Sequence, residues 1–167
     1  LTGTASTLDG VVNVQGGTLA VNDWRAITNN TSAINIGTSS TAGTLAVVGN
    51  NVALANLTTS KVINLSGTTG AATILANQTG TSPGLILNAN FTATGAGAKT
   101  LTLGGTNLAA NTINGAIVNN SGTNTTALTK SDPGTWVLAG TNTYTGATTI
   151  SNGTLRLKAD AASSTIL

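Results

Sequence analysis

Four aspartates are the side chains of this chain that most readily do acid–base or metal chemistry, because histidine, glutamate and cysteine are absent. A paired-acid mechanism or a calcium site needs at least two carboxylates close together. Asp9 precedes a glycine and Asp23 follows an asparagine, so both are typical of turns. The remaining two, Asp132 and Asp160, are distant from them and from each other in the sequence. The sequence therefore predicts a protein that is not an enzyme and has no catalytic residue, metal site or cofactor.

Two short segments resemble catalytic sequence patterns but lack residues that those patterns require. Residues Gly80–Gly84 fit the G-x-S-x-G pattern, but that nucleophile elbow needs a histidine base and a strand-to-helix turn. Its Pro83 instead suits a corner of a β architecture. Residues Gly95–Thr100 carry Ala98 where a phosphate-binding loop requires glycine directly before the lysine. Both segments are predicted to be corners.

Threonines and aromatic residues suggest binding alternatives. Flat solenoid faces with aligned Thr-x-Thr rows can bind ice, which requires the pairs at one register in successive coils. Thr92 and Thr100 are too close for that, and the later pairs within Thr141–Thr145 lie in an expected corner. Trp24, Trp136 and Tyr144 offer sugar-stacking surfaces, although a packing role is favoured for each.

Charge is scarce and dispersed. Only 6% of the residues are charged, against roughly 25% in an ordinary domain, and the net charge is +2. The six basic side chains form no stripe interleaved with aromatic residues, which excludes a typical nucleic-acid surface. There is no run of about 18 apolar residues and no signal peptide, so no membrane span is predicted.

Composition indicates an all-β protein with many corners. Threonine supplies about a fifth of the chain, and the strong helix formers glutamate and methionine are absent. Threonine, valine and isoleucine favour strands, while glycine and asparagine favour turns. Helix is expected at most in a short segment such as Ala159–Ser163.

Apolar residues two positions apart recur from end to end, as in strands with one buried face. Their leaders are about 17 residues apart, which predicts a solenoid of about eight coils. Stacked asparagine and threonine side chains at the corners can add ladder-like hydrogen bonds between coils. The apolar runs are Leu19/Val21, Ile34/Ile36, Leu45/Val47, Ile63/Leu65, Leu85/Leu87, Leu101/Leu103, Ile117 with a weak partner, Trp136/Leu138 and Leu155/Leu157, with Val12/Val14, Val52/Leu54, Ala72–Leu75 and Thr148/Ile150 as additional short runs.

The segment Lys130–Leu157 holds strand, corner and strand within fewer than thirty residues. It resembles the autotransporter-associated β-strand repeat, also called the passenger-associated transport repeat, with weaker echoes at Gly17–Val21 and Gly43–Val47. The resemblance implies a right-handed parallel β-helix secreted to a bacterial surface. The motif residues taken as the structural site are Gly134, Trp136, Leu138, Gly140, Asn142, Tyr144, Gly146, Gly153 and Leu155.

These observations predict a single β-solenoid domain over residues 1–167, as one segment or repeat unit of a longer chain or assembly. The expected function is that of a structural extracellular module, namely a stalk, passenger or fibre subunit. Its expected partner is a further copy, joined end to end through its strands into a homo-oligomer or polymer. The alternatives are an adhesin that binds glycans or a host surface and, less favoured, a carbohydrate-active enzyme or an ice-binding solenoid.

Overall fold

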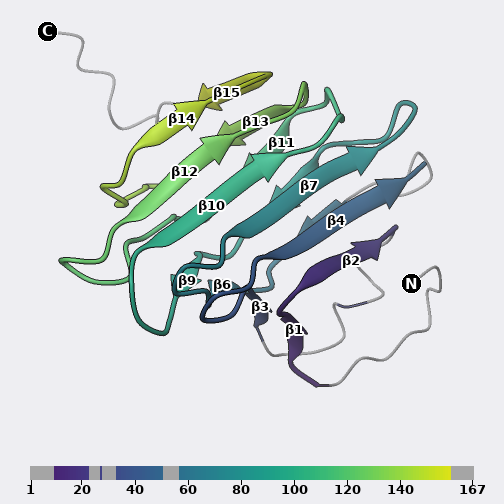
Figure 1. Cartoon of the computed structure of the whole chain (residues 1–167). Helices are drawn as coiled ribbons and strands as arrows, with labels where there is room; N and C mark the ends of the chain where they lie inside the picture. Colours follow the sequence, from purple (N-terminus) through teal and green to yellow (C-terminus); the bar gives the residue numbers. More distant parts are fainter. Residues whose placement is uncertain (1–9, 23–26, 28–32, 51–56, 159–167) are drawn as a thin grey trace, which may run out of the picture.

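The computed structural model describes residues 10–22, 27, 33–50 and 57–158, and these form fifteen β-strands (Figure 1). Every strand pairing in this part of the chain is parallel. In chain order the strands are β1 (Val12–Val14), β2 (Gly17–Val21), β3 (Ile34–Ile36), β4 (Gly43–Gly49), β5 (Leu57–Thr59), β6 (Ile63–Leu65), β7 (Ala72–Gln78), β8 (Leu85–Leu87), β9 (Thr92–Ala93), β10 (Lys99–Gly104), β11 (Asn111–Ile113), β12 (Thr126–Lys130), β13 (Thr135–Leu138), β14 (Thr148–Ile150) and β15 (Thr154–Leu157).

The strands build three sheets around one core. Sheet A has the order β1-β3-β6-β9, sheet B the order β14-β12-β10-β7-β4-β2, and sheet C the order β15-β13-β11-β8-β5. Strands next to one another in a sheet come from successive turns of the chain (Figure 1). The last two turns, β12-β13 and β14-β15, add strands to sheets B and C but none to sheet A. The all-β, parallel β-solenoid fold predicted from the sequence is confirmed.

The predicted coil length and coil number were wrong. In sheet B, Gly17 pairs with Gly43 and Gly43 pairs with Ala72, which gives 26 and 29 residues per coil. At the other end Leu128 pairs with Thr148, only 20 residues later. The sheets contain four, six and five strands, so no sheet has the eight expected rungs. The sequence estimate failed because some successive apolar pairs, such as Ile34/Ile36 and Leu45/Val47, lie in two sheets of the same coil.

The core is a set of stacked apolar columns. Alternation places every second side chain of β7 inside, from Ala72 to Gln78. Across sheet B the inward residues Leu19, Leu45, Ile74 and Leu103 lie in register. Each buried aliphatic side chain contributes roughly 1.5–3 kcal/mol. Trp136 and Phe91 are the largest fully buried side chains among the described residues.

Most predicted runs became strands, and the prolines lie where expected. Pro83 and Pro133 both lie between strands, where the missing amide proton costs no ladder hydrogen bond. Ile117 is fully buried but belongs to no strand. The expected run Val52/Leu54 and the expected helix at Ala159–Ser163 fall outside the described residues.

Candidate functional site: the last coils and their side-chain ladders

The described residues contain no cluster of three or more side chains of the types that ligate metals. Asp132 lies in the corner after β12, where its Oδ2 accepts a 2.8 Å hydrogen bond from the backbone nitrogen of Gly105. Its φ angle of 61° is in the left-handed region, which a tight corner requires and which few non-glycine residues adopt. Asp132 therefore acts as a corner-forming side chain. Asp9, Asp23, Asp160 and the aromatic Trp24 fall outside the described residues.

Trp136 is the centre of the predicted motif and is fully buried in β13. Its indole nitrogen donates a 2.9 Å hydrogen bond to the carbonyl oxygen of Gly104, at the end of β10 in sheet B. The ring thus crosses the core from sheet C and pairs its one polar atom, as a buried tryptophan requires. Leu138, two residues later, is also buried. The buried position of Trp136 argues against its use as a sugar-stacking surface.

The corner between β13 and β14 is fixed to the preceding coil by Asn142. Its Oδ1 accepts a 2.9 Å hydrogen bond from the backbone nitrogen of Ile117, and its Nδ2 donates to the carbonyl oxygen of Gly140 at 3.0 Å. Tyr144 is half-buried against the core, and its hydroxyl lies 2.8 Å from Oγ1 of Thr148. Asn142 and Tyr144 therefore hold the corner to the coil beneath it and to the strand that follows.

The motif glycines lie where successive coils approach closely. A Cβ on Gly146 would overlap the carbonyl oxygen of Thr126, and one on Gly140 would overlap the carbonyl oxygen of Gly115. The same overlap occurs at Gly134 and at Gly153 with corner oxygens of the coil beneath. Glycine at these positions lets the backbone of one corner stack directly on the next.

The last described rung exposes apolar side chains. Ile150 in β14 is 57% exposed and Leu157 in β15 is 77% exposed, while Leu155 is half-buried. In register, Ile150 follows Lys130 and Leu157 follows Leu138, both of which are buried. The apolar columns of the core therefore continue to this surface.

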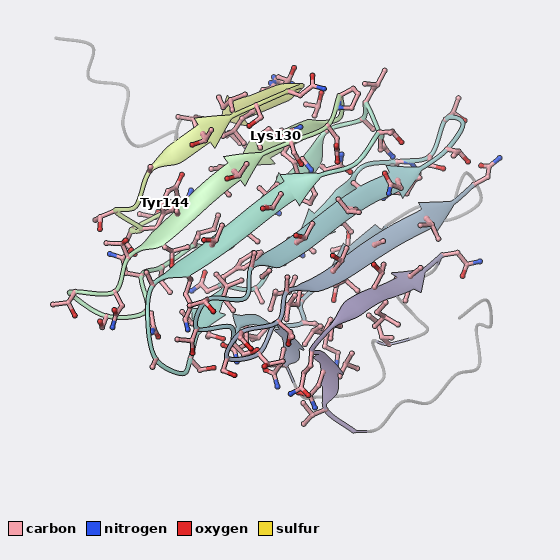
Figure 2. The ribbon with its side chains drawn as sticks, viewed as in Figure 1. Lys130 and Tyr144 are labelled. Carbon is pink, nitrogen blue, oxygen red and sulfur yellow. The ribbon has the colours of Figure 1, made fainter. Side chains whose placement is uncertain are left out.

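The column that contains Ile150 is interrupted by a buried lysine. Leu103 pairs in register with Lys130, which has no exposed surface and lies at the carboxyl end of β12 (Figure 2). Its ammonium group donates hydrogen bonds to the main-chain oxygens of Ser131, Asp132 (2.7 Å) and Asn152 (3.2 Å). Because Asn152 belongs to the next coil, one cation joins the corners of two successive turns. Burial lowers the pKa of Lys130, and the nearby charge of Asp132 raises it in part.

Lys99 is a second buried lysine, at the amino end of β10, whereas Lys130 lies at the carboxyl end of the neighbouring β12. Its Nζ donates to the carbonyl oxygens of Gly67 (2.6 Å) and Ala96 (2.9 Å), and burial lowers its pKa. In the sequence, both lysines are among the six dispersed basic side chains. The alternation of the strands indicates that both side chains point inward. Lys99 is two and four residues from the buried Leu101 and Leu103, and Lys130 is two residues from the buried Leu128.

An asparagine ladder runs along the outer face of sheet A. Nδ2 of Asn35 donates to Oδ1 of Asn13 at 2.8 Å, and Nδ2 of Asn64 donates to Oδ1 of Asn35 at 2.9 Å. Asn64 in turn accepts from Oγ1 of Thr92 at 3.1 Å and donates to Oγ1 of Thr94 at 2.7 Å. A ladder of stacked side chains is thus present on a strand face. At a corner, Nδ2 of Asn114 donates to Oδ1 of Asn88 in the preceding coil at 2.7 Å.

Sheet B carries a threonine column on its outer face, which the sequence analysis missed. The pairing register aligns one threonine from each of the six strands. Neither neighbouring column repeats threonine, so the face lacks the paired rows expected of an ice-binding surface. The signal was the Thr of each Gly-Thr-Leu echo, but its partners are recognised only once the coil length is known. The column comprises Thr18, Thr44, Thr73, Thr102, Thr129 and Thr149.

Among the described residues, no helix has the length and apolar character needed to cross a membrane.

Comparisons with known proteins agree with the repeat found at the last coils. Residues 128–157 match the model of the passenger-associated-transport-repeat, over nearly the segment identified from the sequence. The chain is also similar to the adhesin BmaC autotransporter of Brucella suis biovar 1 (strain 1330), with 37% identity over 138 residues. That match covers 78% of this chain and 4% of the length of the relative. No solved structure matches the chain.

Proposed function

We propose that this chain, which carries a passenger-associated-transport-repeat and is a module of the bacterial cell surface, serves there as a rigid, non-enzymatic spacer. Its last rungs are proposed to accept a further coil of the same kind, so that the rod continues along its axis. The observation that carries this proposal is the open edge of the repeat itself. Within the described residues, β14 ends sheet B and β15 ends sheet C, each paired on one side only (Figure 1).

An open parallel edge presents unpaired amide and carbonyl groups that another strand can pair. Here the edge coincides with exposed Ile150 and Leu157, and covering each gains part of the roughly 1.5–3 kcal/mol that complete burial of such a side chain contributes. Charged side chains are the usual protection of such edges. β14 carries none, and at β15 they are limited to Arg156 and to Lys158 just after the strand. The low net charge of +2 also gives little repulsion between copies. These features favour coaxial addition of a further coil, from the same chain or from a second copy.

The test is the self-association of the protein and of an end variant, measured by analytical ultracentrifugation and electron microscopy. We expect concentration-dependent rods longer than one copy. Leu157→Lys places a charge on the open end and is expected to weaken association at least about tenfold, which is roughly 1.4 kcal/mol. Leu108→Lys is the matched control, because Leu108 is 73% exposed but lies on the side of the rod. A monomer at all concentrations, or equal effects of the two variants, would contradict the proposal.

Adhesion is the second candidate function, favoured by one observation. The relative from Brucella suis is named an adhesin, and its similarity extends over 78% of this chain. A spacer and an adhesive passenger are compatible uses of one scaffold. Beads coated with the purified chain distinguish them: adhesion predicts saturable attachment to a host cell surface, whereas a pure spacer predicts none above uncoated beads.

A further inference from the structure

A groove lies on the side of the rod, between corners of two successive coils. Gln78, the last residue of β7, and residues 79–82 after it form one wall, and residues Thr106–Ala109, which follow β10, form the other. Its volume is about 620 Å³, within the range of small-molecule sites in proteins. The corner shape is held by internal hydrogen bonds, including Ser82 Oγ to the carbonyl oxygen of Thr79 at 2.6 Å and the Ala109 nitrogen to Asn107 Oδ1 at 2.7 Å.

Gln78 marks this groove as unusual. Its side chain takes the inward position at the end of β7 and is 3% exposed, yet both its amide nitrogen and its amide oxygen lack a hydrogen-bond partner. A buried amide without partners is destabilising, so native structures rarely contain one without a reason. The buried Asn111 shows the ordinary solution, because its Nδ2 donates to Ala109 and Thr135 and its Oδ1 accepts from Leu85.

The remaining lining restricts the chemistry of a ligand. No charged side chain lines the groove, which disfavours phosphates, carboxylates and metal cations. The hydroxyls of Thr79, Thr81 and Thr106 can each donate and accept. Leu108 lines the same groove and is 73% exposed, so it offers an apolar surface. A neutral sugar has the matching surface, because its hydroxyls donate and accept hydrogen bonds and lie next to a patch of C–H groups.

We propose that this groove binds a neutral monosaccharide unit of a glycan, with the Gln78 carboxamide as its polar anchor and Leu108 as its apolar platform. To pair with sugar hydroxyls, the carboxamide turns about the Cα–Cβ and Cβ–Cγ bonds from its inward position at the end of β7 to the groove that Gln78 lines. This site is independent of rod extension at β14 and β15. A failure of sugar binding therefore leaves the spacer proposal untouched, and the reverse also holds.

The test uses saturation-transfer NMR on the folded chain with glucose, galactose, mannose and N-acetylglucosamine, and with glucuronate as a charged counterpart. We expect at least one neutral sugar to bind with a millimolar Kd and glucuronate to bind more weakly. Gln78→Leu keeps the side-chain size, removes the unpartnered amide and is expected to weaken binding at least about tenfold while Tm is unchanged or higher. Leu108→Ala, at an exposed position, is expected to weaken binding several-fold without loss of fold.

Gln15→Leu is the matched control, since Gln15 is exposed in a corner away from the groove. It should bind the sugar as the unaltered chain does. The proposal is overturned if no neutral sugar binds at about 100 mM, a Kd range in which specific affinity is negligible. It is also overturned if Gln78→Leu and Leu108→Ala both bind like the Gln15→Leu control.

Discussion

The indole nitrogen of Trp136 donates a 2.9 Å hydrogen bond to the carbonyl oxygen of Gly104, which lies 32 residues earlier in the chain and in a different sheet. Trp136 belongs to sheet C, and Gly104 ends the strand of sheet B in the coil beneath. One side chain of the repeat thus fixes both the distance between two sheets and the order of two coils. The stability of the last coils should depend on it more than on any exposed residue of the motif.

Trp136→Phe removes this hydrogen bond and leaves a space in the core. We expect the free energy of unfolding to fall by about 2–4 kcal/mol, from the lost volume and the unpaired carbonyl oxygen of Gly104. Urea unfolding followed by circular dichroism measures the change. Tyr144→Phe is the control, because the hydroxyl of Tyr144 lies at an exposed contact with Thr148, and its loss should cost less than about 1 kcal/mol. Equal effects of the two substitutions would show that Trp136 does not have this role.

Gly146→Ala should be strongly destabilising, since the new methyl group would overlap the carbonyl oxygen of Thr126 in the coil beneath. Relief requires the two corners to separate, so we expect a loss of more than about 2 kcal/mol. Gly122→Ala is the matched substitution in open space, where nothing lies within 4 Å of the added group. It should change stability by no more than about 0.5 kcal/mol. A tolerated alanine at Gly146 would contradict the close stacking of these corners.

Asn35→Ala removes the middle of the asparagine ladder on sheet A. Asn35 donates to Asn13 and accepts from Asn64, so two hydrogen bonds are lost and about 1–2 kcal/mol of stability with them. Asn13→Ala removes only the bond at the end of this ladder and should cost about half as much. Thermal unfolding of the two variants compares them directly. The ladder is not cooperative support for the coils if Asn35→Ala costs no more than Asn13→Ala.

The buried lysines predict a rise in stability with pH. Burial lowers the pKa of Lys99 and of Lys130 below the ordinary value of 10.5. Between the lowered pKa and 10.5 the unfolded chain binds more protons than the folded chain, so the free energy of unfolding increases with pH across this window. Urea unfolding from pH 7 to pH 10.5 measures the slope.

The double variant Lys99→Met, Lys130→Met should lose most of that slope, because neither group remains to titrate. Lys158→Met is the control, since Lys158 is exposed. It should retain the slope of the unaltered chain. An identical slope in the double variant would mean that the ammonium groups are as favourable inside the corners as they are in water.

The sequence was sufficient for the fold class because the alternation of β7 and the corner glycines of the repeat are local signals. It was insufficient for the coil length, because runs such as Ile34/Ile36 and Leu45/Val47 look alike whether they stack or lie in two sheets of one coil. Only the pairing register separates these cases. The same register is needed to recognise the threonine column.

The repeat was also recognisable from the sequence, whereas the groove was not. Residues Gly134 to Gly146 form one continuous segment with a characteristic order of residue types. The groove combines Gln78 with Leu108, thirty residues away, and its two corners have no motif. Lys130 was predictable only in part. The alternation of β12 indicates its inward position, but the carbonyl oxygens that accept its hydrogen bonds belong to two different corners.

The parallel stacking of successive turns in sheets B and C also determines how the rod would respond to a pull on its end. Each outermost strand is held by a single neighbour, so tension along the chain would strip the rod turn by turn, from the tip inward, instead of breaking it at once. Every stripped turn would release 19 to 29 residues of extended chain and leave a new tip of the same kind. The rod would thereby absorb mechanical shock in repeated small steps while its remaining length stays folded.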